Sequence, residues 1–197
     1  MHGGFITLLF VTSNAHKFTE AREILRSYKI RLKHLSLAYE ETRAHDTKDV
    51  AVKSAKVLFE KIKKPLICED SGLFIQALNG FPGTYSAWVY KKIGNDGILR
   101  LLAKHKNRKA YFKSSVAYTD SKTQKVFCGE VHGIISKCER GKGSFGYDPI
   151  FIPISLSNLQ RQTFAENEML KNTISHRFNA FIKLAKWYQL HHTDPKT

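Results

Sequence analysis

Two carboxylates and a hydroxyl stand side by side in the run Cys68-Glu69-Asp70-Ser71-Gly72-Leu73. The apolar stretch Pro65-Leu66-Ile67-Cys68 is typical of a short buried strand, which we expect to end at this point. Residues at the carboxyl end of such a strand open into the crevice where ligands bind in open α/β sheets. Adjacent acids repel a polyphosphate, so in a basic chain they indicate a divalent metal between acids and substrate. The same residues also fit an ordinary Asp-Ser-Gly turn.

A second group of residues that could bind a ligand lies near the amino terminus, where Thr12-Ser13-Asn14 is followed by Lys17. It joins an apolar strand at residues 5–11 to a segment with helical spacing. Free backbone N–H groups and the positive end of the helix dipole make such a junction an anion site, and Lys17 adds a full charge. The glycine spacing of a phosphate-binding loop is missing. Simple helix capping therefore explains Ser13 or Asn14 equally well.

A third group consists of Glu40 and Glu41 together with Lys53. Magnesium takes oxygen ligands, usually one or two carboxylates plus substrate phosphate and water. Glu41 and Asp70 are candidates for that pair. The alternative is that Glu40 and Glu41 lie on a solvated loop.

The fourth group is the run Gly143-Ser144-Phe145-Gly146-Tyr147-Asp148-Pro149, with Lys171 and Ser175-His176-Arg177 later in the chain. Aromatic rings between glycines can stack on a nucleobase, and a neighbouring carboxylate can bind base edges. Arginine only donates hydrogen bonds, so it suits a base-edge oxygen or a phosphate. The alternatives are a tight turn whose rings pack into the core, and a capping or core role for His176.

The segments that position these groups alternate between strand and helix patterns. Residues 5–11 form an apolar strand, and apolar residues at helical spacing follow the polar turn. A second amphipathic helix can be capped by Asp46 or Thr47, and Pro65 ends it. The remaining predicted elements are, in order, a loop at 80–83, a helix at 95–104, strands at 110–119 and 125–136, a glycine-rich loop at 141–149, a strand at 150–152 and a closing helix.

The second half of the chain is expected to extend the same sheet. The strands at 110–119 and 125–136 are predicted to be antiparallel neighbours joined by the turn at 120–122. No linker or internal repeat separates the halves, so the sequence predicts a single α/β domain spanning residues 1–197. The closing helix has one apolar face, made of Ile174, Phe178, Phe181, Ile182, Ala185 and Tyr188.

Composition limits the class of protein. Lysine and arginine number 32 against 17 acids, a formal charge of +15, which attracts any polyanion: nucleic acid, an anionic membrane surface or a nucleotide. A hydrophobic fraction of 42% is that of a globular protein, and no apolar stretch approaches the length of a membrane span or a secretory signal. We therefore expect a soluble, intracellular protein. Three cysteines lack both zinc-site spacing and an even count, which predicts reduced thiols.

Taken in order, these motifs resemble those of the inosine triphosphate pyrophosphatase family, the Ham1-like nucleotide hydrolases. The resemblance extends from Thr12 to the final helix. Five ordered motifs make a far more specific match than any one of them. The matching segments are Thr12-Ser13-Asn14 with Lys17; Glu69-Asp70-Ser71-Gly72-Leu73; Ala77-Leu78-Asn79-Gly80 with Pro82-Gly83 and Tyr85-Ser86-Ala87; Phe145-Gly146-Tyr147-Asp148-Pro149-Ile150-Phe151; and Thr163-Phe164-Ala165-Glu166 with Lys171-Asn172 and Ile174-Ser175-His176-Arg177.

The resemblance implies hydrolysis of a non-standard purine nucleoside triphosphate, such as ITP, dITP or XTP, to its monophosphate and pyrophosphate, with magnesium. It also implies an elongated α/β structure with two lobes about a long mixed sheet and flanking helices, the active site in the cleft between the lobes, a homodimer and a cytoplasmic location. No membrane association or specific nucleic acid is expected. The implied site residues are Thr12, Ser13, Asn14, Lys17, Lys53 and Lys171 for the triphosphate; Glu41 and Asp70 for the metal; Asp70 also as the base that activates water; Ser71 in contact with substrate; and Phe145, Gly146, Tyr147, Asp148, His176 and Arg177 for the base.

The chain departs from the family pattern in three places. Ser144 stands where the family usually has glycine, the spacing from Glu166 to Lys171 is one residue short, and the usual Asn-Ala pair near Lys53 is missing. Two other functions stay open. One is a related pyrophosphatase for modified pyrimidine nucleotides, and the other is a basic protein that binds single-stranded nucleic acid. A binding protein has no need of the two acids beside an anion site.

Overall fold

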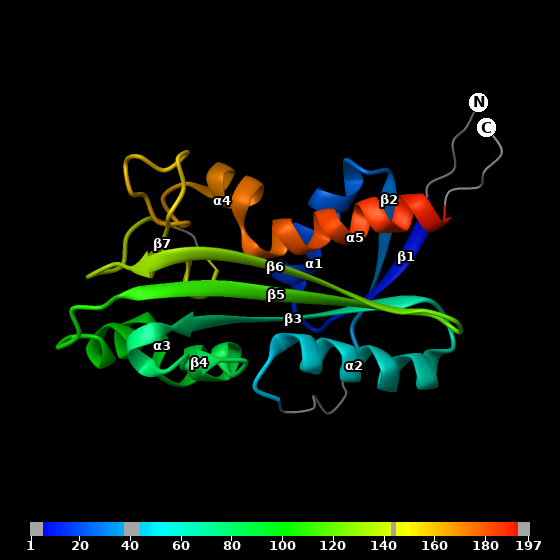
Figure 1. Ribbon diagram of the computed structural model, residues 1–197, viewed down its shortest axis with the longest axis horizontal. Coiled ribbons are helices and arrows are strands. Elements are labelled where there is room, and N and C mark those ends of the chain that lie inside the picture. The colour runs from blue at the N-terminus through cyan, green and yellow to red at the C-terminus, as the bar shows by residue number, and fades with distance from the viewer. Residues whose placement is uncertain (1–5, 38–43, 143–144, 193–197) are drawn as a thin grey trace. The chain divides into compact units, whose positions relative to one another are not determined.

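The computed structural model describes residues 6–37, 44–142 and 145–192, which form an α/β fold (Figure 1). Within them, seven strands form one mixed sheet in the order β2-β1-β3-β5-β6-β7, with β4 paired to β3. The strand β1 is parallel to β2 and β3, whereas β4 is antiparallel to β3 and β7 is antiparallel to β6. The strands are β1 (Ile6–Val11), β2 (Ile30–Leu35), β3 (Leu66–Ile75), β4 (Pro82–Gly83), β5 (Lys109–Thr119), β6 (Gln124–Ile135) and β7 (Phe151–Pro153), and the α-helices are α1 (Ala15–Arg26), α2 (Thr47–Ile62), α3 (Ser86–Leu101), α4 (Glu168–Ile174) and α5 (His176–His192).

The chain divides into two compact units. Unit 1 comprises Met1–Asp70, Ser114–Gly129 and Arg177–Thr197, and unit 2 comprises Ser71–Lys113 and Glu130–His176. The backbone passes from one unit to the other within β3, β5 and β6 and again at the start of α5. The second half of the chain therefore extends the sheet begun by the first half, as the sequence predicts.

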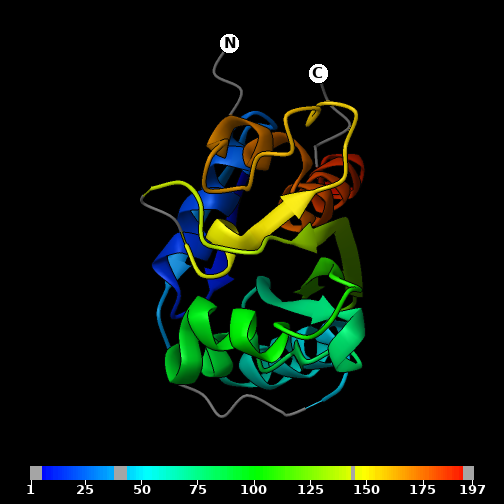
Figure 2. The same ribbon diagram turned by 90° about the vertical axis from the view of Figure 1, so that its left-hand side faces the viewer.

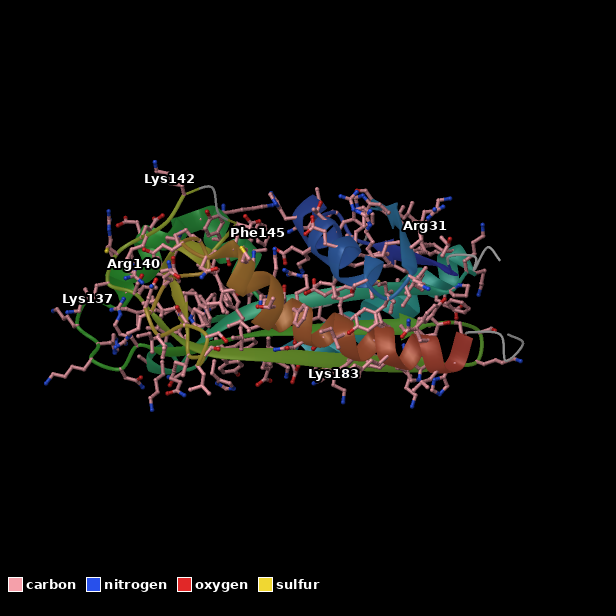
Figure 3. The ribbon with its side chains drawn as sticks, turned by 90° about the horizontal axis from the view of Figure 1, so that it is seen from above. Arg31, Lys137, Arg140, Lys142, Phe145 and Lys183 are labelled. Carbon is pink, nitrogen blue, oxygen red and sulfur yellow. The ribbon has the colours of Figure 1, made fainter. Side chains whose placement is uncertain are left out.

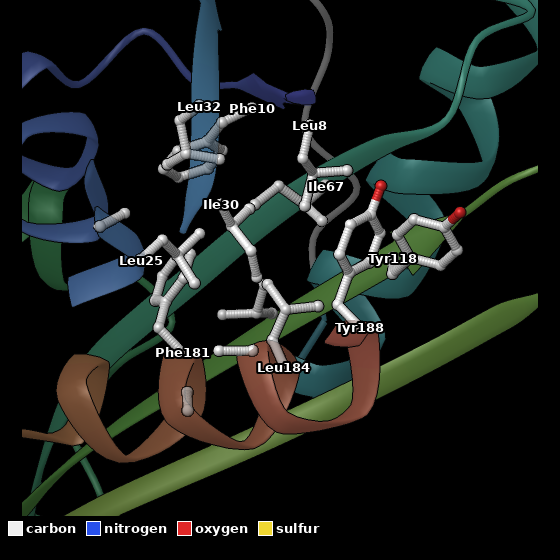
Figure 4. Packing of buried hydrophobic residues seen from close by; sticks show 14 residues of the cluster. Leu8, Phe10, Leu25, Ile30, Leu32, Ile67, Tyr118, Phe181, Leu184 and Tyr188 are labelled. Atoms are coloured by element: carbon white, nitrogen blue, oxygen red, sulfur yellow. The ribbon is translucent and has the colours of Figure 1, made fainter. Parts of the chain in front are cut away.

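The strands of unit 1 carry a different apolar cluster on each face. Alternation along β5 places Val116 and Tyr118 in a cluster with α1 and α5, whereas Ala117 packs in a cluster with α2. Figure 4 shows the first cluster, in which Phe10 and Phe181 are fully buried. Burial of such a side chain contributes roughly 1.5–3 kcal/mol to the free energy of unfolding. The two clusters fix β1 and β3 between helices on both faces.

The core of unit 2 is built between α3 and the strands. Leu73 from β3, Ile98 from α3 and Phe112 from β5 are among its buried members. In Figure 2 the green helix α3 and the orange helix α4 lie on opposite sides of the strands of this unit. Among the helices that the structure describes, none combines the length and the apolar character that a membrane span requires.

The expected end of the strand at Cys68 is wrong, because β3 continues for seven residues to Ile75. Pairing with β4 explains the extension: Leu73 lies opposite Gly83, and Phe74 lies opposite Pro82. A side chain at Gly72 would place its Cβ 2.2 Å from the carbonyl oxygen of Gly83, so this glycine permits close approach rather than a turn. The predicted loop at 80–83 accordingly contains a short strand.

The predicted helix at 95–104 captures only the second part of α3. The helix begins at Ser86, and Gly94 interrupts it with a φ of 61°. Asn95 thus starts the second helical part, as its capping preference indicates, but the sequence analysis missed the first part. The closing helix begins at His176, because Ser175 is the C-cap of α4, so Ile174 belongs to α4 rather than to the apolar face of α5.

Candidate active site

The polar turn between β1 and α1 has the geometry of a capped helix start. The Asn14 side chain accepts hydrogen bonds from the backbone N–H groups of His16 at 3.0 Å and of Lys17 at 3.2 Å. The Thr12 hydroxyl accepts one from the Asn14 N–H at 3.2 Å. Ser13 is exposed between them. The sequence places this turn correctly, and we call residues Thr12 to Lys17 the anion turn.

Glu69 is the centre of a buried charge cluster in unit 1. Its side chain is inaccessible to solvent and lies 2.8 Å from the Lys17 ammonium. The Ser114 hydroxyl donates to it at 2.6 Å, and the Arg177 guanidinium donates to it at 3.3 Å. Arg177 is only 2% exposed and also donates to Glu20. We call these five residues the Glu69 cluster.

The Glu69 cluster keeps its central carboxylate ionised. Burial by itself raises the pKa of Glu69, but the charges of Arg177 and Lys17 outweigh it. Together with hydrogen bonds from Lys17 and Ser114, they lower the pKa to about 2. Both carboxylate oxygens contact these donors, so Glu69 is suited to hold cations in place rather than to accept a proton.

Asp70 is half-buried and is the next residue along β3. Side chains alternate along a strand: Ile67 packs in the cluster with α1 and α5, whereas Leu66 and Cys68 pack in the cluster with α2. Continuation of this alternation puts Glu69 with Ile67 and directs Asp70 to the face that α2 covers. The two adjacent carboxylates therefore have different surroundings.

The lysine predicted for the phosphates on α2 is not joined to the Glu69 cluster by a hydrogen bond or ion pair. Lys53 is exposed on α2 and, within the described part of the chain, makes no hydrogen bond or ion pair through its side chain. Glu41 and its neighbour Glu40 lie outside the described residues. The described residues contain no group of three or more His, Cys, Asp or Glu side chains arranged for a metal ion.

Unit 2 contains a second buried ion pair, between Lys171 and Asp148. The ammonium lies 2.7 Å from the carboxylate, and both side chains are less than a tenth exposed. The same ammonium lies 5.8 Å from the centroid of the Phe145 ring, within the range of a cation–π contact. We call these three residues the aromatic-loop cluster. Exposed basic side chains, including Lys137 and Lys142, extend outward near this loop (Figure 3).

Two further contacts shape the aromatic loop. The Tyr147 hydroxyl donates to the carbonyl of Ser86 at 3.0 Å, so this ring is held in the core and is not exposed to solvent. Burial raises the pKa of this phenol. Gly146 has a φ of 59°, a left-handed conformation that favours glycine, and its carbonyl accepts from the Asn95 amide at 3.3 Å.

The remaining predicted residues of unit 2 have clear positions. His176 is buried and its ring stacks on Phe112 at 4.7 Å with an interplanar angle of 12°. Ser71 is half-buried on β3. The structure thus brings Phe145, Asp148 and Lys171 together, but His176 packs against the core of the unit and its ring contact is with Phe112.

The sequence analysis missed two members of the Glu69 cluster. Glu20 follows Lys17 by three residues, which puts both on one face of α1. Ser114 precedes the apolar alternation of β5 and shares the face of Val116 and Tyr118. Helical spacing gives a usable signal for Glu20. The position of Ser114 beside Glu69 depends on strand pairing, which has no local signal.

The fold and these side chains define a class of α/β protein in which a capped helix start lies beside a buried carboxylate cluster. The Ham1 family model matches residues 8–187 of the chain. A dITP/XTP pyrophosphatase from Thermococcus kodakarensis is 46% identical over 181 residues, covering 91% of this chain and 96% of the relative. One from Methanopyrus kandleri is 45% identical over 184 residues, covering 92% and 96%.

Solved structures agree with these sequence relatives. The Ham1 protein of Staphylococcus aureus superimposes with a TM-score of 0.79 at 27% identity, covering 93% of this chain and 98% of the other. A nucleoside-triphosphatase, dITP/XTP pyrophosphatase, from Mycobacterium abscessus gives a TM-score of 0.70 at 29% identity, covering 91% and 97%. The chain belongs to the Ham1 family.

Proposed function

We propose that the protein hydrolyses non-standard purine nucleoside triphosphates, such as dITP, ITP and XTP, to the monophosphate and pyrophosphate. This activity removes these nucleotides from the nucleotide pool. The observation that carries the proposal is the identity of about 45% over more than nine-tenths of the chain to dITP/XTP pyrophosphatases. The anion turn and the Glu69 cluster supply a physical basis for it.

The anion turn is assigned to the triphosphate. Backbone N–H groups at a helix start and the adjacent Lys17 ammonium attract negative charge. Glu69 holds that ammonium at 2.8 Å while Lys17 keeps 16% of its side chain exposed. Lys53 and Lys171 are assigned to the same phosphates through the family resemblance. Lysines placed in this way position the chain of phosphates and offset its charge during the reaction.

Asp70 is assigned as the base that orients or deprotonates a water for in-line attack on the α-phosphorus, with pyrophosphate as the leaving group. The surroundings of the two adjacent acids favour this choice. Glu69 is occupied by two cations and a hydroxyl, and its low pKa makes it a poor base. Asp70 is half-buried and follows Glu69 along β3, so alternation directs its side chain to the other face of the strand.

The donor chemistry of Asp70 also fits magnesium. A single aspartate, a second carboxylate and substrate phosphates are the usual ligands of this ion, so a cage of three protein side chains is not needed. Asp70 and Glu41 would hold the metal. When bound, magnesium supplies charge neutralisation of the phosphates. Asp70 would then contact both the ion and the water.

Phe145, Gly146, Tyr147 and Asp148 are assigned to the base, together with His176 and Arg177. Ser71 is assigned a contact with substrate. Selectivity is expected to depend on donors that meet the 6-oxo group of the purine: Arg177 and the loop N–H groups. Adenine presents an amino donor there, which leaves mismatched hydrogen bonds. Guanine also has a 6-oxo group, so its exclusion must depend on the 2-amino group.

Four finer statements stay predictions of the family resemblance. They are a homodimer, a cytoplasmic location, an elongated shape with the active site in a cleft between two lobes, and a single domain spanning residues 1–197. Each is testable on the purified protein or by fractionation of cells.

The direct test is pyrophosphate release from dITP, ITP, XTP, GTP and ATP, with and without magnesium. We expect magnesium-dependent release from the first three and far slower release from GTP and ATP. Preference for a modified pyrimidine triphosphate, or salt-dependent oligonucleotide binding with no pyrophosphate release, would contradict the proposal.

The role of Asp70 has a separate test. Asp70→Asn should lower turnover about 10²–10⁴-fold, the usual contribution of a general base, while nucleotide binding stays measurable by calorimetry. Asp96→Asn is a matched control, because Asp96 is exposed on α3 and forms an ion pair with the exposed Arg100. Near-normal turnover of the Asp70 variant would remove this residue from the mechanism.

A further inference from the structure

His34 lies on β2 beside the anion turn, in unit 1. Its Nε2 atom is 2.9 Å from the carbonyl oxygen of Thr12. A carbonyl oxygen can only accept, so the imidazole donates this hydrogen bond. The next residue of the strand also contacts the turn, since the Thr12 N–H donates to the Leu35 carbonyl at 3.1 Å. Two consecutive residues of β2 therefore hold both backbone groups of Thr12.

The contact with His34 has a consequence for the following residue. The peptide unit between Thr12 and Ser13 is planar and trans, so its C=O and N–H groups point in opposite directions. With the carbonyl fixed toward His34, the Ser13 N–H is fixed away from it. Within the described residues no group accepts a hydrogen bond from this N–H, and Ser13 is exposed. A hydrogen bond to the carbonyl also polarises the peptide and strengthens the N–H as a donor.

The ring of His34 is itself held in place. It stacks on Phe18 with ring centroids 4.4 Å apart and planes 14° apart. Phe18 belongs to the first turn of α1, and the guanidinium of Arg22 lies 5.7 Å from its ring on the same helix. Stacking of this kind restricts the imidazole, so the donor is aimed at the Thr12 carbonyl before any ligand arrives.

We propose that His34 is a positioning residue for phosphate binding: it orients the Thr12–Ser13 peptide so that the Ser13 N–H faces the phosphates of the substrate. The inference rests on the assignment of the anion turn to the triphosphate. His34 does not touch the substrate. Its effect is on affinity for the phosphates, because the oriented N–H binds the substrate and the transition state alike.

Two variants separate the donor from the ring. His34→Phe keeps an aromatic ring to stack on Phe18 but has no donor, whereas His34→Gln keeps an N–H donor and loses the ring. His105→Phe is a matched control on an exposed loop of unit 2. For each we would measure KM and kcat for dITP, the dissociation constant of inorganic pyrophosphate by calorimetry, and hydrogen exchange of the peptide containing residues 12–17.

We expect His34→Phe to raise KM and the pyrophosphate dissociation constant about fivefold, the size of one hydrogen bond, with kcat within about twofold. Exchange in residues 12–17 should be faster, and His34→Gln should recover most of the affinity. His105→Phe should match the wild type. Equal losses in the Phe and Gln variants, or a His34→Phe variant with unchanged pyrophosphate affinity, would overturn the inference. A loss of thermal stability without a change in affinity would overturn it too.

A Lys17→Met variant measured in the same assays distinguishes this inference from the assignment beneath it. If Lys17→Met weakens pyrophosphate binding and His34→Phe does not, the role of His34 is wrong while the anion turn keeps its assignment. If neither variant weakens it, the assignment of the turn to the phosphates is wrong, and the role of His34 fails with it.

Discussion

The Glu69 cluster of unit 1 and the aromatic-loop cluster of unit 2 each bury a lysine against a carboxylate, but they are built differently. Glu69 binds two cations and a hydroxyl, supplied by three other elements of the fold. Asp148 pairs with Lys171 of the short helix α4, whose ammonium also lies 5.8 Å from the centroid of the Phe145 ring. The first arrangement makes a rigid framework across the unit, and the second links one loop to one helix.

The difference indicates a division of labour. A carboxylate that accepts from several fixed donors holds the Lys17 ammonium in place beside the anion turn, which is assigned to the phosphates. The ion pair of Asp148 with Lys171 lies in the aromatic loop, which is assigned to the base. Loss of the Glu69 cluster should therefore lower the free energy of unfolding most. Loss of the aromatic-loop cluster should mainly lower the affinity for the nucleotide.

The largest expected effect is that of Glu69→Gln. It leaves the buried Arg177 and the partly buried Lys17 without their shared carboxylate, and removal of one partner from a buried ion pair costs about 3–5 kcal/mol. We expect the free energy of unfolding at pH 7 to fall by about 3–4 kcal/mol in urea denaturation. Glu60→Gln, which breaks an exposed pair on α2, should leave it unchanged within error. A Glu69→Gln variant as stable as the wild type would contradict the larger contribution to stability that we assign to the Glu69 cluster.

The pH dependence of stability should show the same carboxylate. The pKa of Glu69 is about 2 in the folded protein against an ordinary value of 4.5. Its stabilisation is therefore complete above about pH 4.5 and is lost as the pH falls toward 2, amounting to about 3 kcal/mol. The difference in unfolding free energy between wild type and Glu69→Gln should shrink over that range. A difference that stays constant from pH 7 to pH 2 would contradict the assigned surroundings of Glu69.

A smaller effect is expected from Asp148→Asn in unit 2. It removes the ion pair with Lys171, and the amide oxygen can still accept from that ammonium. We expect a loss of about 2–3 kcal/mol in unfolding free energy. The double variant Asp148→Asn/Lys171→Met also removes the Lys171 ammonium, which Asp148→Asn alone leaves without a carboxylate. It should recover part of the lost unfolding free energy in the same denaturation experiment. No recovery would show that the pair is not an isolated contact, contrary to the comparison.

The smallest expected effects separate two helix caps. Asn14 caps α1 within the anion turn, and Asp46 caps α2. Replacing either by alanine should lower the unfolding free energy by about 1 kcal/mol. Only Asn14→Ala should also raise KM for dITP, since only that cap shapes the proposed phosphate site. An equal change in KM for both variants would mean that the effect comes from stability alone.

Much of the fold was predictable because its signals are local. Capping residues before apolar periodicity placed α1 and α2, and Asp120 placed the turn between β5 and β6 by accepting from the Lys122 and Thr123 N–H groups. The length of β3 was not predictable, because the Asp-Ser-Gly run has turn chemistry and pairing with neighbouring strands, β4 among them, keeps it extended.

The candidate site was predictable in the same uneven way. The motifs identified Asp70, Lys17 and the aromatic loop, because these residues stand in short runs with recognisable order. The contacts of Glu69 were not evident, since its partners Lys17, Ser114 and Arg177 come from α1, β5 and α5 and meet it only when those elements pack. Contacts between residues far apart in the chain leave no spacing pattern to detect.

The most direct test of the division of labour uses the two products as separate ligands. Calorimetry with pyrophosphate and with dIMP would be carried out on the wild type, Lys17→Met and Phe145→Ala. The account predicts that Lys17→Met raises the dissociation constant of pyrophosphate at least tenfold and changes that of dIMP little. Phe145→Ala should raise the dissociation constant of dIMP at least tenfold and change that of pyrophosphate little. If each variant weakened both ligands to the same extent, the assignment of phosphates to the anion turn and of the base to the aromatic loop would be contradicted.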